Sequence, residues 1–397
     1  MKGSVLLISQ NFYPELGSAA NRMKKLFEQL DQNGYSPVIV TTEPSYPNIE
    51  LFKSDQYFND EYLNSLENHR IHRIKMRFQK QHPSLLFRLL YYIELMIKIR
   101  FYLKKAQKFQ NIIVTSPNIF LAWATLFLKK NRNAKYFLEI RDLWPDSFLD
   151  LTKNKLNGIR PILKWLEKKM YKQADEIIIN NPYFETHINQ LLGKQKQYLY
   201  LPNAFTKDEC RCNEKLEDFS VIYTGNIGYA QDVNQLIDIA KHLNQKGIHF
   251  SAVVYGVHAN RFRKFVKDEN LKYVHLIPPM KREECLNLIS KHHVSLSILK
   301  QTRVFMNVMP GKVIDSISCY TPIVANLGGD TCQLINDNHI GYSKENATTD
   351  EIVNYIELLK KDKKRLSETI KNTKGVSENQ FIWEKNITKL IKVLRGG

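Results

Sequence analysis

Short apolar runs alternate with amphipathic stretches along most of the chain. Ten of these runs have the β-branched, almost continuous apolar character of buried strands. Five lie at residues 4–9, 37–41, 111–115, 136–139 and 176–179, and five at 220–223, 249–255, 273–276, 294–298 and 322–325. Because strands that alternate with helices form parallel sheets covered on both faces, the pattern predicts an α/β protein. We expect two doubly wound, Rossmann-like domains that face each other across a cleft.

The boundary between the two series of strands is predicted in the polar stretch 201–219. The last stretch, 380–394, has apolar side chains at helical spacing, and no strand candidate follows it. It therefore predicts a C-terminal helix that can cross back to the first domain.

Composition and targeting signals narrow the class of protein. The apolar run near the N-terminus is too short for a signal peptide, and charges interrupt the longest apolar region, 84–103, so no membrane span is expected. The five cysteines contain one lone C-x-C pair and no second ligand pair. This usage predicts reduced thiols in a cytoplasmic protein, without a disulfide framework or a zinc site.

The charge balance favours polyanionic partners. The chain has 58 Lys and Arg residues against 40 Asp and Glu residues, a formal charge of +18. Residues 70–109 concentrate this charge, with eleven cations, the one acidic residue Glu94, and many interleaved aromatic and aliphatic side chains. Such a segment predicts contact with an anionic membrane surface. The alternative is an ordinary core-facing helix with solvated cations. No recognised nucleic-acid module is present, so nucleic acid is not an expected partner.

Two loops of the first domain could carry chemistry, because ligands of open parallel sheets bind beyond the carboxyl ends of the strands. The loop after the first strand places Gly17 and Ser18 before a helix, whose N-terminus can receive an anion. The loop 139–146 after the fourth strand gathers acidic groups, an arginine and a tryptophan. There Arg141 and Asp142 predict a substrate-binding role, or else a structural ion pair.

In the second domain, Gly225 and Asn226 follow the first strand, where a glycine allows a diphosphate to approach the backbone. Further on, Pro310 and Gly311 open a helix that carries Lys312. The free N–H groups of its first turn, Lys312 and Arg303 predict a diphosphate site.

Asp315 lies one helical turn after Gly311, where its carboxylate can accept hydrogen bonds from a ribose diol. The alternative is a surface ion pair between Lys312 and Asp315, worth only tenths of a kcal/mol. No D-x-D sequence and no convincing metal-ligand cluster is present, so a metal site is not expected.

These motifs together resemble the retaining glycosyltransferases of family 4, which have the GT-B fold. The resemblance extends over nearly the whole chain, through FYPELGSAA, EIRDLWPDS, ADEIII, LPNA, TGNIGYAQ and PGKVIDSISCYTPIVA in this order. IRDLWPDS, TGNIG and PGK resemble the bacterial branch that builds capsules and O-antigens, including N-acetyl-L-fucosaminyltransferases.

The resemblance implies three regions: an acceptor-binding domain at 1–203, a nucleotide-sugar-binding domain at 204–378, and a C-terminal helix at 379–397 that packs on the first domain. By position, Lys312 and the Gly311 amide would neutralise the donor diphosphate, near the Gly17–Ser18 loop and Gly225–Asn226. Asp315 would bind the ribose. Residues Pro279 and Met280 would contact the base, and Arg141 and Asp142 would lie near the transferred sugar.

Three positions depart from the family pattern. Asp315 stands where the family usually has glutamate, and Asn307 falls near the first glutamate of its paired motif. Asn226 and Gln231 occupy the places of a frequent basic pair, for which Arg303 or Lys300 can compensate.

The implied function is transfer of a sugar, such as N-acetylfucosamine, from a UDP-sugar to a polyprenyl-diphosphate-linked saccharide, with retention and without a metal or other cofactor. In this class the leaving diphosphate is thought to assist the reaction. The enzyme would act in capsule or surface polysaccharide synthesis as a peripheral protein on the inner face of the plasma membrane. Two alternatives remain: a UDP-sugar epimerase of the same fold, and a non-enzymatic basic membrane-binding protein.

Overall fold

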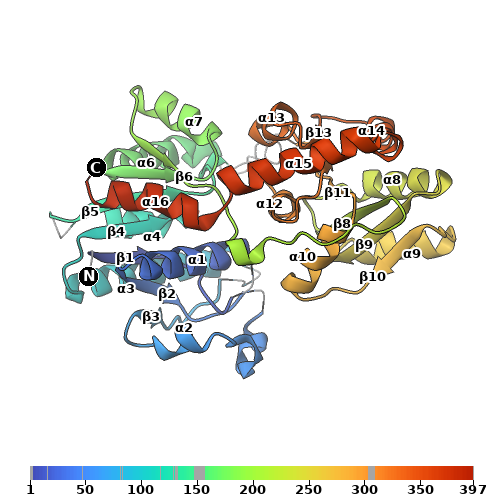
Figure 1. Cartoon of the computed structure of the whole chain (residues 1–397). Helices are drawn as coiled ribbons and strands as arrows, with labels where there is room; N and C mark the ends of the chain where they lie inside the picture. Colours follow the sequence, from blue (N-terminus) through green and yellow to red (C-terminus); the bar gives the residue numbers. More distant parts are fainter. Residues whose placement is uncertain are drawn as a thin grey trace. The chain divides into compact units, whose positions relative to one another are not determined.

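The computed structural model describes residues 3–15, 17–46, 48–80, 82, 84–116, 118–127, 129, 133–146, 157–302 and 309–396. The chain divides into two compact units, Met1–Pro202 with Ile387–Gly397, and Asn203–Asn386. Each unit is a parallel sheet covered by helices on both faces (Figure 1). The prediction of two doubly wound α/β domains is confirmed, and the fold is GT-B.

The first unit contains a sheet in the order β3-β2-β1-β4-β5-β6-β7. Its strands are β1 (Ser4–Ile8), β2 (Ser36–Thr42), β3 (Ile71–Ile74), β4 (Asn111–Thr115), β5 (Lys135–Ile140), β6 (Glu176–Ile179) and β7 (Tyr198–Tyr200). Its helices are α1 (Ser18–Gln32), α2 (Glu61–Ser65), α3 (Leu85–Lys105), α4 (Ile119–Leu126), α6 (Arg160–Gln173), α7 (Tyr183–Leu192) and most of α16 (Trp383–Leu394). Short 3₁₀ turns lie at η1 (Ile49–Lys53), η2 (Asp55–Tyr57) and η3 (Asn157–Ile159).

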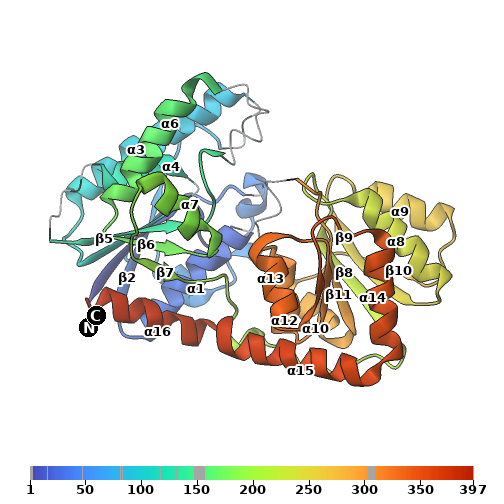
Figure 2. The ribbon, with the colours of Figure 1, turned by 90° about the horizontal axis from the view of Figure 1, so that it is seen from above.

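The helices of the first unit form two layers. One core cluster packs α3, α4, α6 and α7 against the same face of the sheet, and α1 and α16 cover the opposite face (Figures 1 and 2). The strand order reverses between β1 and β4, so the loops after these two strands diverge at the carboxyl edge. Such switch points are where ligands bind in open α/β sheets.

The second unit contains a sheet in the order β10-β9-β8-β11-β12-β13. Its strands are β8 (Ser220–Asn226), β9 (His249–Tyr255), β10 (Val274–Ile277), β11 (Val294–Ser297), β12 (Ile323–Ala325) and β13 (Gly341–Ser343). Its helices are α8 (Val233–Gln245), α9 (Ala259–Asp268), α10 (Arg282–Lys291), α12 (Gly311–Ser318), α13 (Gly329–Asp337), α14 (Thr349–Lys361) and α15 (Lys363–Gln380), with a 3₁₀ turn η4 (Lys207–Glu209). The switch point lies between β8 and β11.

All ten predicted strands are present, but the sequence pattern missed β3, β7 and β13. Each missed strand lies at an edge of its sheet and has only three or four residues. Two of them carry polar side chains within the strand, His72 and Arg73 in β3 and Ser343 in β13. Edge strands are commonly short and polar, so they lack the continuous apolar run that marks the central strands.

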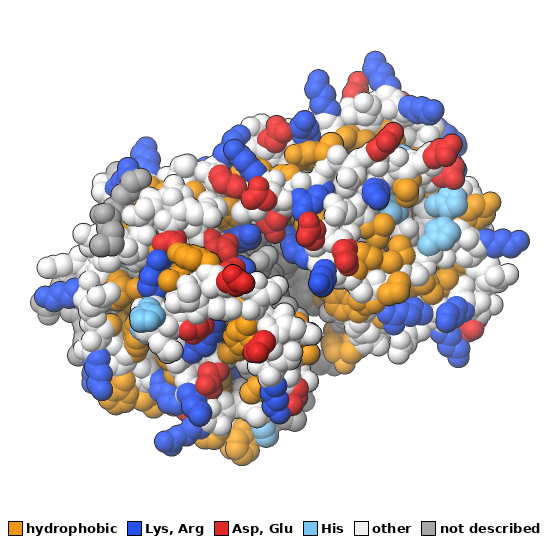
Figure 3. All heavy atoms as spheres, turned by 60° about the horizontal axis from the view of Figure 1, so that its bottom comes forward, with side chains coloured by type: hydrophobic (Ala, Val, Ile, Leu, Met, Phe, Trp, Pro, Cys, Tyr) orange, Lys and Arg blue, Asp and Glu red, His pale blue; other side chains and the backbone are white. Residues whose placement is uncertain are grey.

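One face of the molecule carries charges of both signs. On the face drawn in Figure 3, Lys and Arg side chains are scattered among Asp and Glu side chains. Among the described residues, no helix is both long and apolar enough to cross a bilayer.

Candidate functional site

The loops at the switch point of the second unit are tied together by backbone hydrogen bonds. The Ile227 N–H donates to the carbonyl of Tyr255 at 2.7 Å, and the Lys300 N–H donates to the carbonyl of Ala230 at 2.8 Å. The loops after β8, β9 and β11 therefore form one connected rim at the carboxyl edge. Gly225 lies on this rim with φ of 110°, and a Cβ added there would meet nothing within 4 Å. The backbone at Gly225 is thus open to a ligand.

Asn226 is exposed and lies against Gly256, which follows β9. A Cβ at Gly256 would be only 1.8 Å from the Asn226 Oδ1 atom, and the Gly256 φ of 101° also disfavours any other residue. Gly256 therefore makes room for the Asn226 side chain. Asn226 is an uncharged amide, so this position contributes hydrogen bonds rather than positive charge to the rim.

A network of amides that the sequence did not reveal fixes the loop after β11. The Oδ1 atom of buried Asn326 accepts the Leu299 N–H at 2.8 Å, and its Nδ2 donates to the Leu299 carbonyl at 2.7 Å. The same Nδ2 donates to Gln235 Oε1 at 2.6 Å. Gln301 donates to the carbonyls of Leu299 and Asn326 at 3.1 and 2.8 Å. These hydrogen bonds fix the chain up to Gln301. The predicted ligands Arg303 and Asn307 lie outside the described residues.

The Nζ atom of Lys312 is buried and forms no salt bridge with the residues that the structure describes. Its Nζ lies 3.8 Å from the centroid of the Tyr223 ring, and it has no hydrogen-bond partner among the described residues. Tyr223 is fully buried in β8, the strand that ends at the open Gly225. An ammonium over an aromatic face gains some electrostatic attraction, but the ring replaces little of the lost hydration.

Burial lowers the pKa of Lys312 to about 7, although the nearby Asp315 carboxylate acts to raise it. A phosphate at this position would supply the missing negative charge and acceptor atoms. Gly311 precedes Lys312 and is the first residue of α12, behind Pro310 as N-cap, and the space around its Cα is open. The first-turn N–H groups of a helix lack intrahelical partners and favour anions. The predicted pairing of a helix N-terminus with one cation is thus present.

Asp315 pairs with a residue that the sequence analysis did not select. Its Oδ1 lies 2.9 Å from Nη2 of Arg282 on α10, and Nε of Arg282 lies 3.4 Å from Oε1 of Glu209. The described ion pairs therefore join Asp315 to Arg282, and the alternative of a surface pair between Lys312 and Asp315 is wrong. Burial raises the pKa of Asp315, and the opposing effect of Arg282 is smaller.

The predicted base-contacting residues lie at the same edge of the sheet. Exposed Pro279 and half-buried Met280 follow β10 and precede α10, the helix that carries Arg282. Their position is consistent with a role beside a nucleotide, but no contact in the structure tests that role.

In the first unit, the buried carboxylate of Glu15 holds the chain just before the Gly17–Ser18 loop. Oε1 of Glu15 accepts hydrogen bonds from the Ser45 N–H at 2.8 Å and the Tyr46 N–H at 3.0 Å. Nζ of Lys80 lies 2.7 Å from the same oxygen, and burial lowers the pKa of Lys80 despite this carboxylate. Gly17 has φ of 135° and caps the exposed N-terminus of α1. Gly17 and Ser18 are therefore exposed, and their contact with a phosphate stays a prediction.

The loop after β5 is built on a buried triad of charges. Nε of Arg22 lies 2.9 Å from Oε1 of Glu139, and the guanidinium also donates to the carbonyls of Leu201 and Pro202 at 2.8 Å. Burial raises the pKa of Glu139, but Arg22 and Arg141 outweigh it, and the net pKa is lowered. Glu139 thus forms a structural ion pair, while the substrate-binding role of Arg141 and Asp142 stays a prediction.

Arg141 is left with excess positive charge beside this pair. Its Nε is buried without a hydrogen-bond partner among the described residues. Burial lowers the pKa of Arg141 to about 10, Glu139 acts to raise it, and Arg22 acts to lower it. The side chain of Asp142 is exposed next to it. Arg141 is consequently a cation at the carboxyl edge that can still accept an anionic or hydroxyl-bearing ligand.

Several cations of the segment 70–109 are already paired within the unit. Arg70 binds Asp31 at 2.6 Å, Arg73 binds Glu67 at 2.5 Å, and Lys80 binds Glu15. These three side chains are largely buried, so they cannot reach a membrane surface. Lys75, Arg77 and Lys108 stay exposed, as do several cations of α3.

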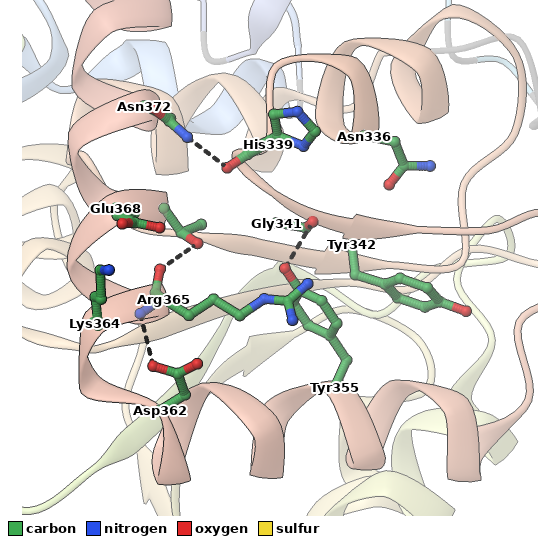
Figure 4. A pocket seen from close by; sticks show the side chains of 11 residues that line it. Asn336, His339, Gly341, Tyr342, Tyr355, Asp362, Lys364, Arg365, Glu368 and Asn372 are labelled. Atoms are coloured by element: carbon green, nitrogen blue, oxygen red, sulfur yellow. Dashed lines mark hydrogen bonds between the residues drawn. The ribbon is translucent and has the colours of Figure 1, made fainter.

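The second unit also contains a pocket of about 670 Å³ (Figure 4). It lies where β13 begins at Gly341, hence at the amino edge of the sheet and away from the loops after β8 and β11. Tyr355 stacks on Tyr342 at 5.1 Å and donates to the Gly341 carbonyl at 3.0 Å, which closes one wall. We therefore place the candidate site at the carboxyl edge, and not in this pocket. The described residues contain no group of His, Cys, Asp and Glu side chains arranged to hold a metal.

Comparison with known proteins defines the class. Residues 206–376 match the family "Glycosyl transferases group 1", and this range includes Gly225, Lys312 and Asp315. The match lies within the second unit, and the comparisons support a glycosyltransferase with the GT-B fold.

The individual relatives share little sequence identity with this chain. The putative colanic acid biosynthesis glycosyl transferase WcaI of Escherichia coli is 21% identical over 349 residues, which cover 80% of this chain and 84% of WcaI. Sucrose-phosphate synthase of Thermosynechococcus elongatus has a TM-score of 0.74 at 15% identity, with 99% and 98% of the two chains covered. HepE of Anabaena, solved with UDP and glucose, has a TM-score of 0.67 at 13% identity, with both chains fully covered.

Proposed function

We propose that the protein transfers a sugar from a UDP-sugar to a polyprenyl-diphosphate-linked saccharide, with retention of the anomeric configuration. The product would serve capsule or surface polysaccharide synthesis, and the sugar would be an N-acetylated deoxyhexosamine such as N-acetylfucosamine. Support comes from the WcaI relative, whose name assigns it to colanic acid biosynthesis, and from HepE, which was solved with UDP.

The single observation that carries the donor site is Lys312. Its Nζ atom is buried over the Tyr223 ring and has no hydrogen-bond partner among the described residues. The ammonium group has therefore lost hydration that these residues do not replace with hydrogen bonds. A donor diphosphate would supply that compensation, together with the N–H groups at the start of α12. Gly225 and Asn226 would border the phosphates, and Asp315 would accept the ribose hydroxyls while Arg282 holds its other oxygen.

Other predicted residues complete the proposed site. Pro279 and Met280 would contact the uracil, and Arg303 and Asn307 would come from the segment before Pro310. In the first unit, Gly17 and Ser18 would face the reacting phosphate, and Arg141 and Asp142 would lie near the transferred sugar.

The proposed chemistry needs little from protein bases. The bond between the anomeric carbon and the β-phosphate oxygen breaks, and its electron pair leaves with UDP. The acceptor hydroxyl oxygen forms the new bond on the same face of the sugar, and its proton passes to the departing phosphate. Lys312 and the α12 amides would stabilise the negative charge that grows on that phosphate, which is electrostatic catalysis without a metal.

The lipid-linked acceptor would bring the protein to the inner face of the plasma membrane as a peripheral protein of the cytoplasm. The exposed cations and apolar side chains of α3, within residues 70–109, would supply the contact with anionic lipid.

The decisive experiment measures UDP release from UDP-N-acetylhexosamines, with and without a solubilised polyprenyl-diphosphate saccharide, in the presence of EDTA. We expect acceptor-dependent release in the wild type and a loss of at least about a hundredfold in Lys312→Ala, since one electrostatic donor commonly contributes that much. Conversion of the UDP-sugar to an isomer without acceptor would instead identify an epimerase. Absence of UDP binding in a thermal-shift assay would leave only a non-enzymatic role.

A further inference from the structure

Helix α6 exposes an apolar stripe that the sequence pattern did not predict. The buried side of the helix carries Glu167, Met170 and Tyr171. On the opposite side, Ile162 is 61% exposed and Trp165 is 59% exposed. Monomeric proteins rarely leave such large apolar side chains in water without a purpose when they belong to a larger patch.

Helix α3 exposes a second apolar stripe. Its buried side packs Tyr91, Leu95 and Ile99 into the core, at helical spacing. The other side exposes large apolar side chains, namely Leu86, Phe87, Leu89, Ile97 and Phe101. The helix is therefore apolar on both sides, which a purely core-facing helix would not require.

An aromatic chain across α4 joins the two stripes. Tyr92 of α3 stacks on Phe120 at 5.5 Å, and Trp123 contacts Phe120 at 5.2 Å and Phe127 at 6.0 Å. Lys169 of α6 then lies over both Phe127 and Trp165, at 4.8 and 5.1 Å from the two ring centroids. All three helices cover the same face of the sheet (Figure 2). Their outward sides thus form one continuous surface, which we name the α3–α4–α6 face.

Most charged side chains on the helices of this face are cations. Helices α3 and α6 carry ten cations: Arg88, Lys98, Arg100, Lys104, Lys105, Arg160, Lys164, Lys168, Lys169 and Lys172. Their two acidic residues are withdrawn from water, since Glu167 is buried and Glu94 lies next to Lys98 at 2.6 Å with little exposure. Asp146 pairs with Arg160 and Lys164, and the other cations leave a net positive charge around the apolar stripes. An apolar surface with such a surplus of cations complements an anionic lipid surface.

We infer that the α3–α4–α6 face docks on an anionic bilayer, with Trp165 and Ile162 of α6 as anchors that enter the interface. The inference rests on the proposed function with its lipid-linked acceptor, and it deepens it by extending the membrane contact from α3 to α4 and α6. Tryptophan favours the headgroup region, where its ring is buried and its N–H stays hydrated. The paired cations Arg70, Arg73 and Lys80 take no part.

Trp165 provides its own spectroscopic test. The chain has four tryptophans, and among them Trp165 is exposed, Trp123 and Trp144 are half-buried, and Trp383 is 1% exposed. The full-length protein is mixed with phosphatidylglycerol–phosphatidylcholine vesicles whose acyl chains carry bromine, a contact quencher. We expect quenching and a blue shift of the emission. Trp165→Phe should lose most of the quenching while it still sediments with vesicles.

Ile162→Glu tests docking itself, with Leu358→Glu as the matched control, since Leu358 is an exposed apolar residue on α14 of the other unit. Ile162→Glu should lower vesicle binding at least about fivefold, because one charge near an anionic surface alone contributes that factor. Leu358→Glu should bind as the wild type. Equal binding of Ile162→Glu and wild type, or quenching that persists in Trp165→Phe, overturns the inference.

Two further results would also overturn it. Equal binding to pure phosphatidylcholine would remove the role of the cations. Concentration-dependent dimerisation that Ile162→Glu abolishes would assign the face to a second copy of the chain. The vesicles contain neither donor nor acceptor, so the two proposals can fail separately. Loss of vesicle binding with intact transfer to a detergent-solubilised acceptor would refute only the docking surface. Vesicle binding without any sugar transfer would refute the proposed function.

Discussion

The state of Lys312 predicts that donor binding depends on pH. Without a ligand its pKa is lowered to about 7 by burial. A bound diphosphate would raise this pKa well above neutrality, so only the protonated form should bind the donor strongly. The protonated fraction falls from about 0.9 at about pH 6 to about 0.03 at about pH 8.5. The apparent Kd should therefore rise about thirtyfold over this interval.

The measurement is calorimetric titration with UDP-N-acetylglucosamine at a series of pH values. A UDP-sugar is preferable to UDP, because the terminal phosphate of UDP titrates near about pH 6 and would add its own pH dependence. Lys312→Met is the control: it should bind weakly at every pH and show no change in this interval. A wild-type Kd that stays constant within about twofold would refute the assignment of Lys312 to the diphosphate.

Lys312 should also make the free energy of unfolding depend on pH: donor binding weakens as the pH rises, whereas the ligand-free protein becomes more stable. Its pKa is about 7 in the folded protein against 10.5 for an unperturbed lysine, so the unfolded state binds more protons between these values. The free energy of unfolding should then increase with pH above about 7, by at most about 1.4 kcal/mol per pH unit. Urea titrations of the ligand-free wild type and Lys312→Met would resolve this slope. A wild-type slope no steeper than that of the variant would contradict a buried, titrating Lys312.

Three further substitutions test neighbouring parts of the structure. Tyr223→Leu removes the ring below Lys312 and should shift the pH dependence of donor binding to lower pH, whereas Tyr223→Phe should not; equal titration curves for both would argue against the cation–π contact. Asp315→Asn should reduce discrimination between UDP and dideoxy-UDP by about tenfold or more, as measured by competition, and unchanged discrimination would exclude the ribose role. Arg22→Met leaves Glu139 buried without its partner and should cost about 3–5 kcal/mol in urea unfolding, a result that a loss below about 1 kcal/mol would contradict.

The central strands and the site loops were predictable because both depend on local sequence. Strands such as β8 and β9 are buried on both faces, so their residues are apolar without interruption. The Pro310–Gly311 start of α12 is also a local signal. The edge strands could not be predicted, because β3 interrupts its apolar residues with His72 and Arg73.

Pairings between distant residues could not be predicted either. Asp315 meets Arg282, which lies on another helix, and Glu139 meets Arg22 across 117 positions. No spacing rule relates such positions, because the sheet order and not the sequence brings them together. Trp165 was missed for a different reason. In the sequence, α6 resembles any amphipathic helix with its lysines in water. The structure shows instead that Glu167 is buried and that Trp165 is exposed.

The first unit is assembled from two separate stretches of chain, and this affects the order in which the protein can fold. Residues Ile387–Gly397 belong to it, and Leu390 of α16 is fully buried. The Lys135 side chain at the start of β5 donates to the Val393 carbonyl at 3.4 Å. During synthesis, residues 203–386 are therefore complete while the first unit still lacks a helix that covers one face of its sheet. The second unit can mature first, and the first unit must keep an apolar surface open until the last stretch of the chain is made.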